Sequence, residues 1–143
     1  MEFENLRLSQ QLCFALYSAT HAITRLYKGS LEKVGLTYPQ YLVMIVLWEA
    51  DKVSVKHIAE RLDLDSASLT PILKRLEKAG FLGRVRNTHD ERALDVSLTQ
   101  AGRDLQAQVA DIQQQVVCKT GLVEDEFNLL KQQLNKLTAA LNN

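Results

Sequence analysis

The chain has 143 residues and a formal net charge of zero, with 46% hydrophobic and 24% charged residues. This length and composition are typical of a globular protein with one core. No apolar run approaches the roughly 18–20 residues that would span a bilayer, and the acidic residues 1–5 lack the pattern of a secretory signal. We therefore expect a cytoplasmic protein that does not enter a membrane.

The chain contains two cysteines, Cys13 and Cys118, which are too few for the disulfide framework of a secreted domain. In a reducing compartment they are either inert buried thiols or a transient redox pair. The three histidines lie far apart, and no group of cysteines, histidines or carboxylates has the spacing of a metal site. We therefore expect no metal and no other cofactor.

The first 50 residues predict two helices. The apolar residues of the first helix alternate at spacings of four and three, and they are Leu8, Leu12, Ala15, Ala19, Ala22 and Leu26. We expect Ser9 to cap this helix, which ends near Gly29 or Gly35. A second helix, with Thr37 as its cap and a proline in its first turn, runs to Trp48 and is apolar enough to be buried.

Two shorter helices are predicted next. Ser54 caps the first of them, which carries four apolar residues and reaches Leu62. Asp65 or Ser66 caps the second, whose leucines and isoleucine share one face. Gly80 is the expected stop of this second helix.

After the second short helix the apolar period changes from helical to two. Residues 81–86 and 93–98 therefore read as the strands of a hairpin, with residues 87–92 between them. Two helices followed by a hairpin is the order of a winged helix-turn-helix. We predict an α/β fold, mainly α, with this module at about residues 36–98.

The C-terminal third predicts two more helices. Thr99 caps a long one with Leu105, Val109, Ile112 and Val116 in register, Gly121 ends it, and a last helix carries Phe127, Leu130, Leu134, Leu137 and Leu141. We expect a single domain in which residues 1–35 and 99–143 are dimerisation helices, because the small module cannot cover all their apolar seams. The alternative is that these seams are internal core. A homodimer would also space two DNA-reading helices for two half-sites.

The distribution of charge points to double-stranded DNA although the total is zero. Residues 74–92 include six basic and three acidic side chains, a local net charge of +3 that suits a surface meeting phosphates. Hydroxyls at a helix N-terminus can approach bases and phosphates, and an arginine at the hairpin tip, held by a nearby aspartate, can enter a narrow minor groove. The predicted DNA-binding residues are Ser66, Ser68, Thr70, Lys74, Arg75, Lys78, Arg84, Arg86, Asp90 and Arg92. The alternative is an ordinary amphipathic helix followed by a solvated turn.

Cys13 lies near the predicted N-terminus of the first helix, where the helix dipole favours a thiolate. Tyr17 follows one turn later, so its hydroxyl can approach the sulfur. Tyr27 is 14 residues from Cys13, a rise of about 21 Å along a straight helix. A hydrogen bond from Tyr27 to this thiolate must therefore come from a second subunit. The alternative is that Cys13 is a small buried hydrophobe.

Six motifs spread over nearly the whole chain carry a resemblance to a known family. They are Leu12–Tyr17, Thr37–Tyr41, Leu64–Pro71, Leu73–Glu77, Asp90–Arg92 and Leu98–Gly102. Together they resemble the MarR family of winged-helix regulators, which implies a dimeric winged helix on pseudopalindromic DNA. The motif around Cys13 resembles the organic hydroperoxide resistance regulators, OhrR, within that family.

The OhrR resemblance implies a thiol switch shared by two subunits. Tyr27 and Tyr38 of one subunit would donate hydrogen bonds to Cys13 of the other, and Cys118 marks the two-cysteine type, in which it resolves the oxidised Cys13 across the dimer. The reduced homodimer would repress transcription and leave its operator when an organic hydroperoxide oxidises Cys13. An apolar pocket for that hydroperoxide could use Phe14, Leu16, Tyr38, Met44 and Trp48, which could equally be core.

Two other functions stay open at this point. A MarR-type regulator released by a reversible small aromatic ligand would leave Cys13 incidental. A thiol peroxidase would be an enzyme, but nothing in the chain resembles the arginine-threonine thiol pocket of that class. We therefore expect a regulator and not an enzyme.

Overall fold

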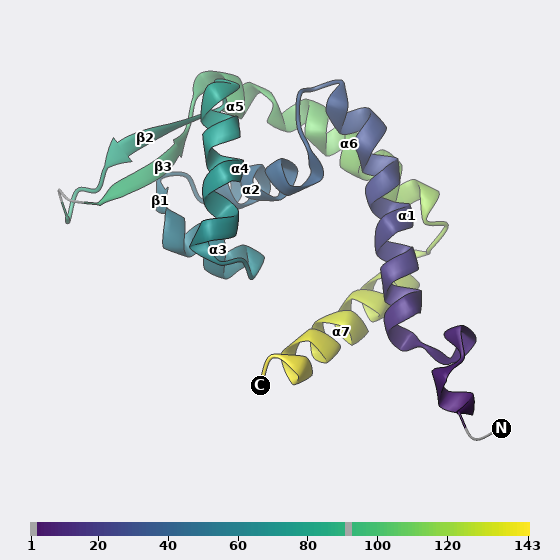
Figure 1. The fold of residues 1–143 in the computed structure, drawn as a ribbon. Helices are drawn as coiled ribbons and strands as arrows, with labels where there is room; N and C mark the ends of the chain where they lie inside the picture. The colour runs from purple at the N-terminus through teal and green to yellow at the C-terminus, as the bar shows by residue number, and fades with distance from the viewer. Residues whose placement is uncertain (1–2, 91–92) are drawn as a thin grey trace.

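The computed structural model describes residues 3–90 and 93–143 and is mainly helical, with one small sheet (Figure 1). Two short 3-10 turns, Glu4–Leu6 and Leu8–Gln10, precede the first α-helix. The other elements are α1 (Leu12–Glu32), α2 (Tyr38–Glu49), β1 (Val53–Ser54), α3 (Val55–Leu62), α4 (Ser66–Lys78), β2 (Leu82–Arg86), β3 (Leu94–Leu98), α5 (Gln100–Asp104), α6 (Gln106–Lys119) and α7 (Glu124–Leu141). Among the described residues no helix is long and apolar enough to cross a membrane.

The predicted hairpin is present as β2 and β3, which pair antiparallel with Leu82 opposite Leu98. A third strand, β1, pairs with the other edge of β3 and places Val53 opposite Val96. The sequence pattern did not predict β1, because two residues are too few for an alternating pattern to be seen. The order α3, α4, β2, β3 confirms the winged helix-turn-helix expected for the middle of the chain.

The core of this module forms around α2, which contacts α1, α3, α4 and β3. Val43, Met44 and Leu47 of α2 are fully buried. The surrounding elements contribute Leu31, Ile58, Leu69, Leu73, Leu76 and Val96, each almost fully buried. A capping box fixes the start of α2, because the backbone N–H of Thr37 donates to Gln40 Oε1 at 2.9 Å and the backbone N–H of Gln40 donates to Thr37 Oγ1 at 3.3 Å.

Other predicted helix ends are also confirmed. Three caps accept hydrogen bonds from backbone amides three residues later, Ser54 from His57, Asp65 from Ser68 and Thr99 from Gly102. The predicted stops Gly35, Gly80 and Gly121 have φ of +81°, +87° and +69°. Glycine adopts this left-handed conformation without steric cost, so these positions let the chain leave its helices.

The predicted start of the first helix is wrong. Ser9 is not a cap, because it lies in the 3-10 turn Leu8–Gln10, and α1 begins at Leu12 with Gln11 in the cap position. The side-chain amide of Gln11 donates to the backbone carbonyl of Asn5 at 2.7 Å. The backbone of Gln11 is extended, with φ of −90° and ψ of 113°, and this separates the preceding turns from α1.

The long helix expected after Thr99 is divided into α5 and α6 at Leu105. In a continuous α-helix the carbonyl of Gly102 would accept from the backbone N–H of Gln106. Here that carbonyl instead accepts a hydrogen bond from the indole N–H of Trp48 on α2, at 3.0 Å. The side chain of Trp48 thus connects α2 to the point where the helix is interrupted.

The terminal helices lie outside the winged module. Figure 1 shows α1 beside α6 and α7 turning back from the far end of α6. No residue of α7 is buried, and α1 contributes only Tyr27 and Leu31 to the core. The exposed large hydrophobic residues of these two helices are Leu12, Phe14, Tyr17, Ile23, Leu26, Leu129, Leu130, Leu134 and Leu141. The predicted apolar seams of α1 and α7 are therefore largely uncovered within one chain. The seam of the helix after Thr99 is instead internal core, because Leu105, Val109 and Val116 are buried.

Candidate thiol site and DNA-binding surface

Cys13 is the second residue of α1, and its side chain is exposed and not in a disulfide. In the first turn of a helix the backbone N–H groups have no acceptor within the helix, and the dipole favours a negative charge. The later helix start places Cys13 closer to this terminus than the sequence pattern predicted. In the single chain Cys13 is therefore an accessible thiol and not part of the core.

Tyr27 and Tyr38, the predicted hydrogen-bond donors, lie together in a tyrosine cluster that also contains Tyr41. The ring centroids are 5.3 Å apart for Tyr27 and Tyr38, 5.1 Å for Tyr27 and Tyr41, and 5.6 Å for Tyr38 and Tyr41. Burial raises the pKa of Tyr38 and of Tyr41, and a side-chain hydrogen bond with Tyr27 raises the pKa of Tyr41 further. Tyr38 and Tyr41 therefore keep their hydroxyl protons at neutral pH.

Tyr41 is a residue that the sequence reasoning missed. It follows Tyr38 by three residues on α2, a spacing that places both side chains on one face of a helix. This spacing could have predicted the pair, but the sequence pattern indicates Tyr41 only as part of the apolar helix that runs to Trp48. It is buried, with 5% of its surface exposed.

The structure does not bring Cys13 and the tyrosine cluster together within one chain. Cys13 and Tyr27 lie on the same helix, α1, where 14 residues correspond to a rise of about 21 Å. Tyr17 lies one turn after Cys13, but its ring packs against His21 with centroids 4.3 Å apart. Within residues 3–90 and 93–143 Tyr17 makes no hydrogen bond to Cys13.

Cys118 is the second-last residue of α6, exposed and not in a disulfide. At a helix C-terminus the dipole disfavours a thiolate. Gly121 follows with a positive φ and ends the turn. The two cysteines thus lie at opposite kinds of helix end, Cys13 at the N-terminus of α1 and Cys118 at the C-terminus of α6.

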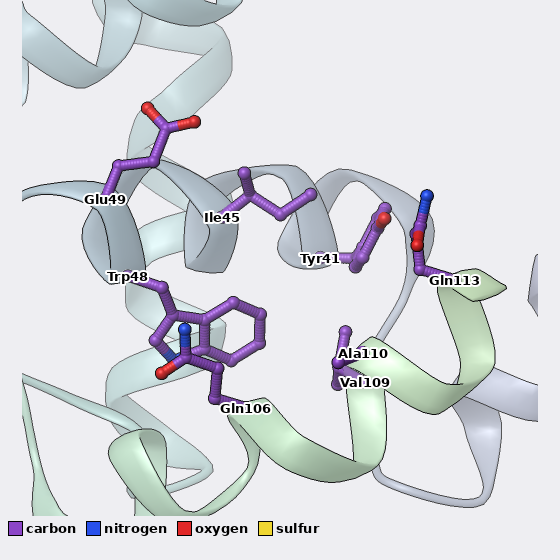
Figure 2. Close-up of a pocket in the computed structure, with 8 residues that line it drawn as sticks. All are labelled: Tyr41, Ile45, Trp48, Glu49, Gln106, Val109, Ala110 and Gln113. Carbon is purple, nitrogen blue, oxygen red and sulfur yellow. The ribbon is translucent and has the colours of Figure 1, made fainter. Parts of the chain in front are cut away.

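An open pocket of about 260 Å³ lies between α2 and α6. Figure 2 shows Tyr41 and Trp48 projecting from α2 toward α6, where Gln106 and Gln113 border the opposite side. The remaining lining residues are Ile45, Glu49, Val109 and Ala110. Trp48 therefore lies in a pocket wall, as the sequence allowed.

The other residues suggested for an apolar pocket lie elsewhere. Met44 is fully buried in the core and Phe14 is exposed on α1. Leu16 is half-buried on α1, and Tyr38 borders a different cavity, between α1 and the start of α2. The structure therefore does not bring the five residues together into one pocket.

α4 carries the predicted DNA-reading residues of the helix on its exposed faces. Leu69, Leu73 and Leu76 turn inward, while Ser66, Ser68, Lys74, Arg75 and Lys78 are exposed and Thr70 is half-buried. Hydrogen bonds from the backbone and side chain of Ser68 lower the pKa of Asp65, which caps the helix. This arrangement leaves hydroxyls at the N-terminus and cations toward the C-terminus, as predicted.

The wing contains two arginines in different environments. Arg84 forms an ion pair with Glu77 of α4, which joins the wing to the DNA-reading helix. Arg86, two residues later on β2, is exposed and has no ion pair among the described residues. Glu77 was not recognised from the sequence, because an ion pair between elements seven residues apart leaves no periodic signal.

The tip of the wing is organised by Asn87. Its side-chain oxygen accepts hydrogen bonds from the backbone N–H groups of His89 at 2.8 Å and Asp90 at 3.1 Å. Its side-chain nitrogen donates to both carboxylate oxygens of Asp95 at 3.2 Å. Asn87 thus fixes the turn that carries Asp90. Arg92 lies outside the described residues.

The part of the chain that the structure describes contains no cluster of three or more histidine, cysteine, aspartate or glutamate side chains that could hold a metal ion. Within the same residues, no buried side-chain nitrogen or oxygen lacks a hydrogen-bond partner.

Comparison with known proteins places the chain among transcriptional regulators. Residues 25–109 match the family model described as transcriptional regulator SarA/Rot. The chain is 45% identical over 135 residues to the HTH-type transcriptional regulator TtmR of Methylorubrum extorquens, covering 94% of this chain and 69% of that protein. It is 38% identical over 141 residues to the organic hydroperoxide resistance transcriptional regulator of Bacillus subtilis, covering 99% and 96%.

Solved structures of AbfR from Staphylococcus epidermidis resemble the fold over 99% of this chain. Reduced AbfR bound to DNA is 35% identical, with a TM-score of 0.81 and 97% of its chain covered. Disulfide-formed AbfR is also 35% identical, with a TM-score of 0.67 and 94% covered. Because these relatives are regulators and not enzymes, and because the winged helix-turn-helix is present, the chain belongs to the MarR-type winged-helix transcriptional regulators, in the branch that includes SarA/Rot and OhrR.

Proposed function

We propose that the chain is a peroxide-sensing repressor that binds operator DNA when Cys13 is reduced and leaves it when an organic hydroperoxide oxidises Cys13. The observation that carries this proposal is an exposed thiol, not in a disulfide, in the first turn of α1. The similarity to the Bacillus subtilis organic hydroperoxide resistance regulator supports it. The similarity to reduced AbfR bound to DNA and to disulfide-formed AbfR supports it as well.

The proposed chemistry has two steps. The Cys13 thiolate attacks the terminal oxygen of the hydroperoxide, the O–O bond breaks, and the remaining alkoxide takes a proton and leaves as the alcohol. The sulfur, oxidised by two electrons, becomes a sulfenic acid. The thiol of Cys118 from the other subunit then displaces the sulfenic hydroxyl, so that a disulfide forms and water leaves. Tyr27 and Tyr38 supply hydrogen bonds that stabilise the thiolate of the other subunit.

We propose that a second copy of the chain packs against the exposed apolar seams of α1 and α7. Leu12 is 64% exposed and Leu129 is 55% exposed in the single chain, although both belong to regular helices. Contiguous apolar surface of this kind marks an interaction site, and a homodimer would bury both helices. It would also let Cys13 of one subunit approach the tyrosine cluster of the other, which the distance along α1 forbids within one chain.

The proposed contacts to DNA come from α4 and the wing. The hydroxyls of Ser66, Ser68 and Thr70 approach bases and phosphates, and Lys74, Arg75 and Lys78 approach the backbone. Arg84 and Arg86 line the wing, and Arg92, positioned by Asp90, enters the minor groove. Two copies of this surface in a homodimer fit a pseudopalindromic operator.

The disulfide between subunits tests this proposal. One equivalent of cumene hydroperoxide should convert the 16.2 kDa chain to a covalent dimer on a non-reducing denaturing gel, and dithiothreitol should reverse it. Cys118→Ser should still form a sulfenic acid at Cys13, detected with a dimedone probe, but no covalent dimer. Absence of both the dimer and the sulfenic acid in the parent protein would overturn the proposal.

A second candidate function is release from DNA by a reversible small aromatic ligand. The pocket between α2 and α6 favours it, because Tyr41 and Trp48 offer aromatic faces to such a ligand. Under this function Cys13 is incidental, so DNA release would be insensitive to alkylation of the thiol. If peroxide releases the DNA and alkylation of the Cys13 thiol abolishes this release, a reversible ligand is excluded as the main signal.

A further inference from the structure

The antiparallel pairing of β1 with β3 stops at Val53, which lies opposite Val96. One step back along β1 is one step forward along β3, so continued pairing would place Asp51 opposite Leu98. Lys52, between Asp51 and Val53, instead has a φ of +58°, a left-handed conformation that non-glycine residues rarely adopt. The strand therefore ends before it reaches the residue opposite Leu98.

Two charged side chains take over the backbone pairing that β1 does not complete at Leu98. The backbone N–H of Leu98 donates to Asp51 Oδ1 at 2.8 Å, and its carbonyl accepts from Arg103 Nη1 at 3.1 Å. Arg103 Nη1 also lies 3.6 Å from Asp51 Oδ2, so the two side chains form an ion pair across the end of β3. Both charged groups are partly exposed, whereas Leu98 is buried. Loss of either side chain would leave a backbone group of β3 without this partner.

The ion pair between Asp51 and Arg103 joins three elements at the base of the wing. Asp51 follows α2, Leu98 is the last residue of β3, and Arg103 lies on α5. Trp48 of α2 strengthens the same joint, since its indole N–H donates to the carbonyl of Gly102 on α5. Figure 1 shows β2 and β3 projecting from the winged module, with α5 following the end of β3. Because β2 pairs with β3 along its whole length, the direction of β3 at its base sets where the arginines of β2 lie.

We propose that Asp51 and Arg103 are positioning residues for DNA binding, which hold the base of the wing and so set where its arginines meet the DNA. The inference rests on the DNA contacts proposed for Arg84 and Arg86, and in it neither Asp51 nor Arg103 touches DNA. It needs no step of the thiol chemistry. Loss of the ion pair should therefore weaken the binding of the reduced protein to DNA without slowing the oxidation of Cys13.

The sign of the effect on DNA affinity separates positioning from simple attraction between charges. Asp51→Ala removes a negative charge, which by long-range electrostatics alone would strengthen binding to DNA. Arg103→Lys keeps the positive charge but replaces the guanidinium, which contacts both Leu98 and Asp51, by a single nitrogen. We expect each variant to bind a labelled DNA fragment about fivefold more weakly than the parent in fluorescence anisotropy, the size of one lost hydrogen bond. Asp51→Asn keeps an oxygen that can accept from the backbone of Leu98, so this variant should lose less affinity than Asp51→Ala.

Asp104→Ala is the matched control for the loss of a negative charge. Asp104 is exposed on α5 beside Arg103, and its carboxylate accepts a hydrogen bond from the side chain of Gln100 at 2.7 Å, on the same helix. This variant should bind DNA at least as tightly as the parent. Urea denaturation of each variant checks that the fold remains intact.

Double variants test whether the effect of Asp51 passes through the wing. Asp51→Ala should cost less affinity in an Arg86→Gln background, where a wing contact is already lost, than in a Lys74→Gln background, where a contact of α4 is lost. Equal losses in the two backgrounds, or parent-like or tighter binding by either Asp51→Ala or Arg103→Lys, would overturn the positioning role while the proposed function stands. If the reduced parent protein selects no DNA fragment, the proposed function itself is wrong.

Discussion

The rings of Tyr27 on α1 and Tyr38 on α2 lie with their centroids 5.3 Å apart, although the residues are 11 positions apart in the chain. This contact places two phenol groups at the junction of the first helix with the winged module. Because Cys13 is far along α1 from this junction, the pair can reach a thiolate only if another chain supplies it. The geometry of one chain thus makes the proposed sensor a property of the dimer.

Replacing these tyrosines should slow the oxidation of Cys13. Tyr27→Phe and Tyr38→Phe each remove a hydroxyl that is the proposed hydrogen-bond donor to the sulfur of the other subunit, while they preserve the packing of the ring. The rate of Cys13 oxidation by cumene hydroperoxide, measured in a stopped-flow instrument, should be lower in each variant than in the parent. Cys13→Ser provides the background from Cys118. If neither rate changes, neither tyrosine donates to this sulfur.

Gly102 should tolerate no side chain. A Cβ atom there would overlap the backbone carbonyl oxygen of Phe81, so Gly102→Ala should lower the free energy of unfolding by about 2 kcal/mol in urea denaturation. Gly29→Ala is the matched control, because Gly29 lies within α1 and has nothing within 4 Å of the added atom. That change should instead stabilise the protein by up to about 1 kcal/mol, since alanine favours helix. If the two changes had equal effects on the free energy of unfolding, α5 would not pack against the backbone of Phe81 at Gly102.

The two wing arginines should differ in their contribution to DNA affinity. Arg86 is exposed without an ion pair among the described residues, whereas the charge of Arg84 is partly neutralised by Glu77. Arg86→Gln should therefore weaken binding more than Arg84→Gln and reduce the slope of log affinity against log salt by about 1. Fluorescence anisotropy of labelled DNA, measured over a series of salt concentrations, gives both the affinity and this slope for each variant. A larger loss for Arg84→Gln would mean that the ion pair with Glu77 opens on DNA.

Local sequence signals predicted the helices and the hairpin well, because each depends on neighbouring residues. Thr37, Ser54 and Thr99 cap helices where their side chains and spacing indicate. The break at Leu105 could not be predicted in this way, since it depends on a hydrogen bond from Trp48, 54 residues before Gly102. Ser9 failed as a cap because Gln11, two residues later, contacts the preceding turns.

The candidate site was predictable only in part for the same reason. Cys13 and Tyr38 could be named from sequence motifs, whereas the contact of Tyr38 with Tyr27 is seen only in the structure. Tyr41 and Glu77 act through contacts between elements, which apolar periodicity does not report.

The binding of DNA before and after oxidation tests the central claim most directly. A labelled DNA fragment selected by the reduced protein is titrated, treated with one equivalent of cumene hydroperoxide per chain, and then treated with dithiothreitol. We expect bound DNA to be released by the hydroperoxide and recovered after reduction, while Cys13→Ser stays bound throughout. Release of Cys13→Ser as readily as the parent, or a parent that stays bound after mass spectrometry shows Cys13 fully oxidised, would contradict the account.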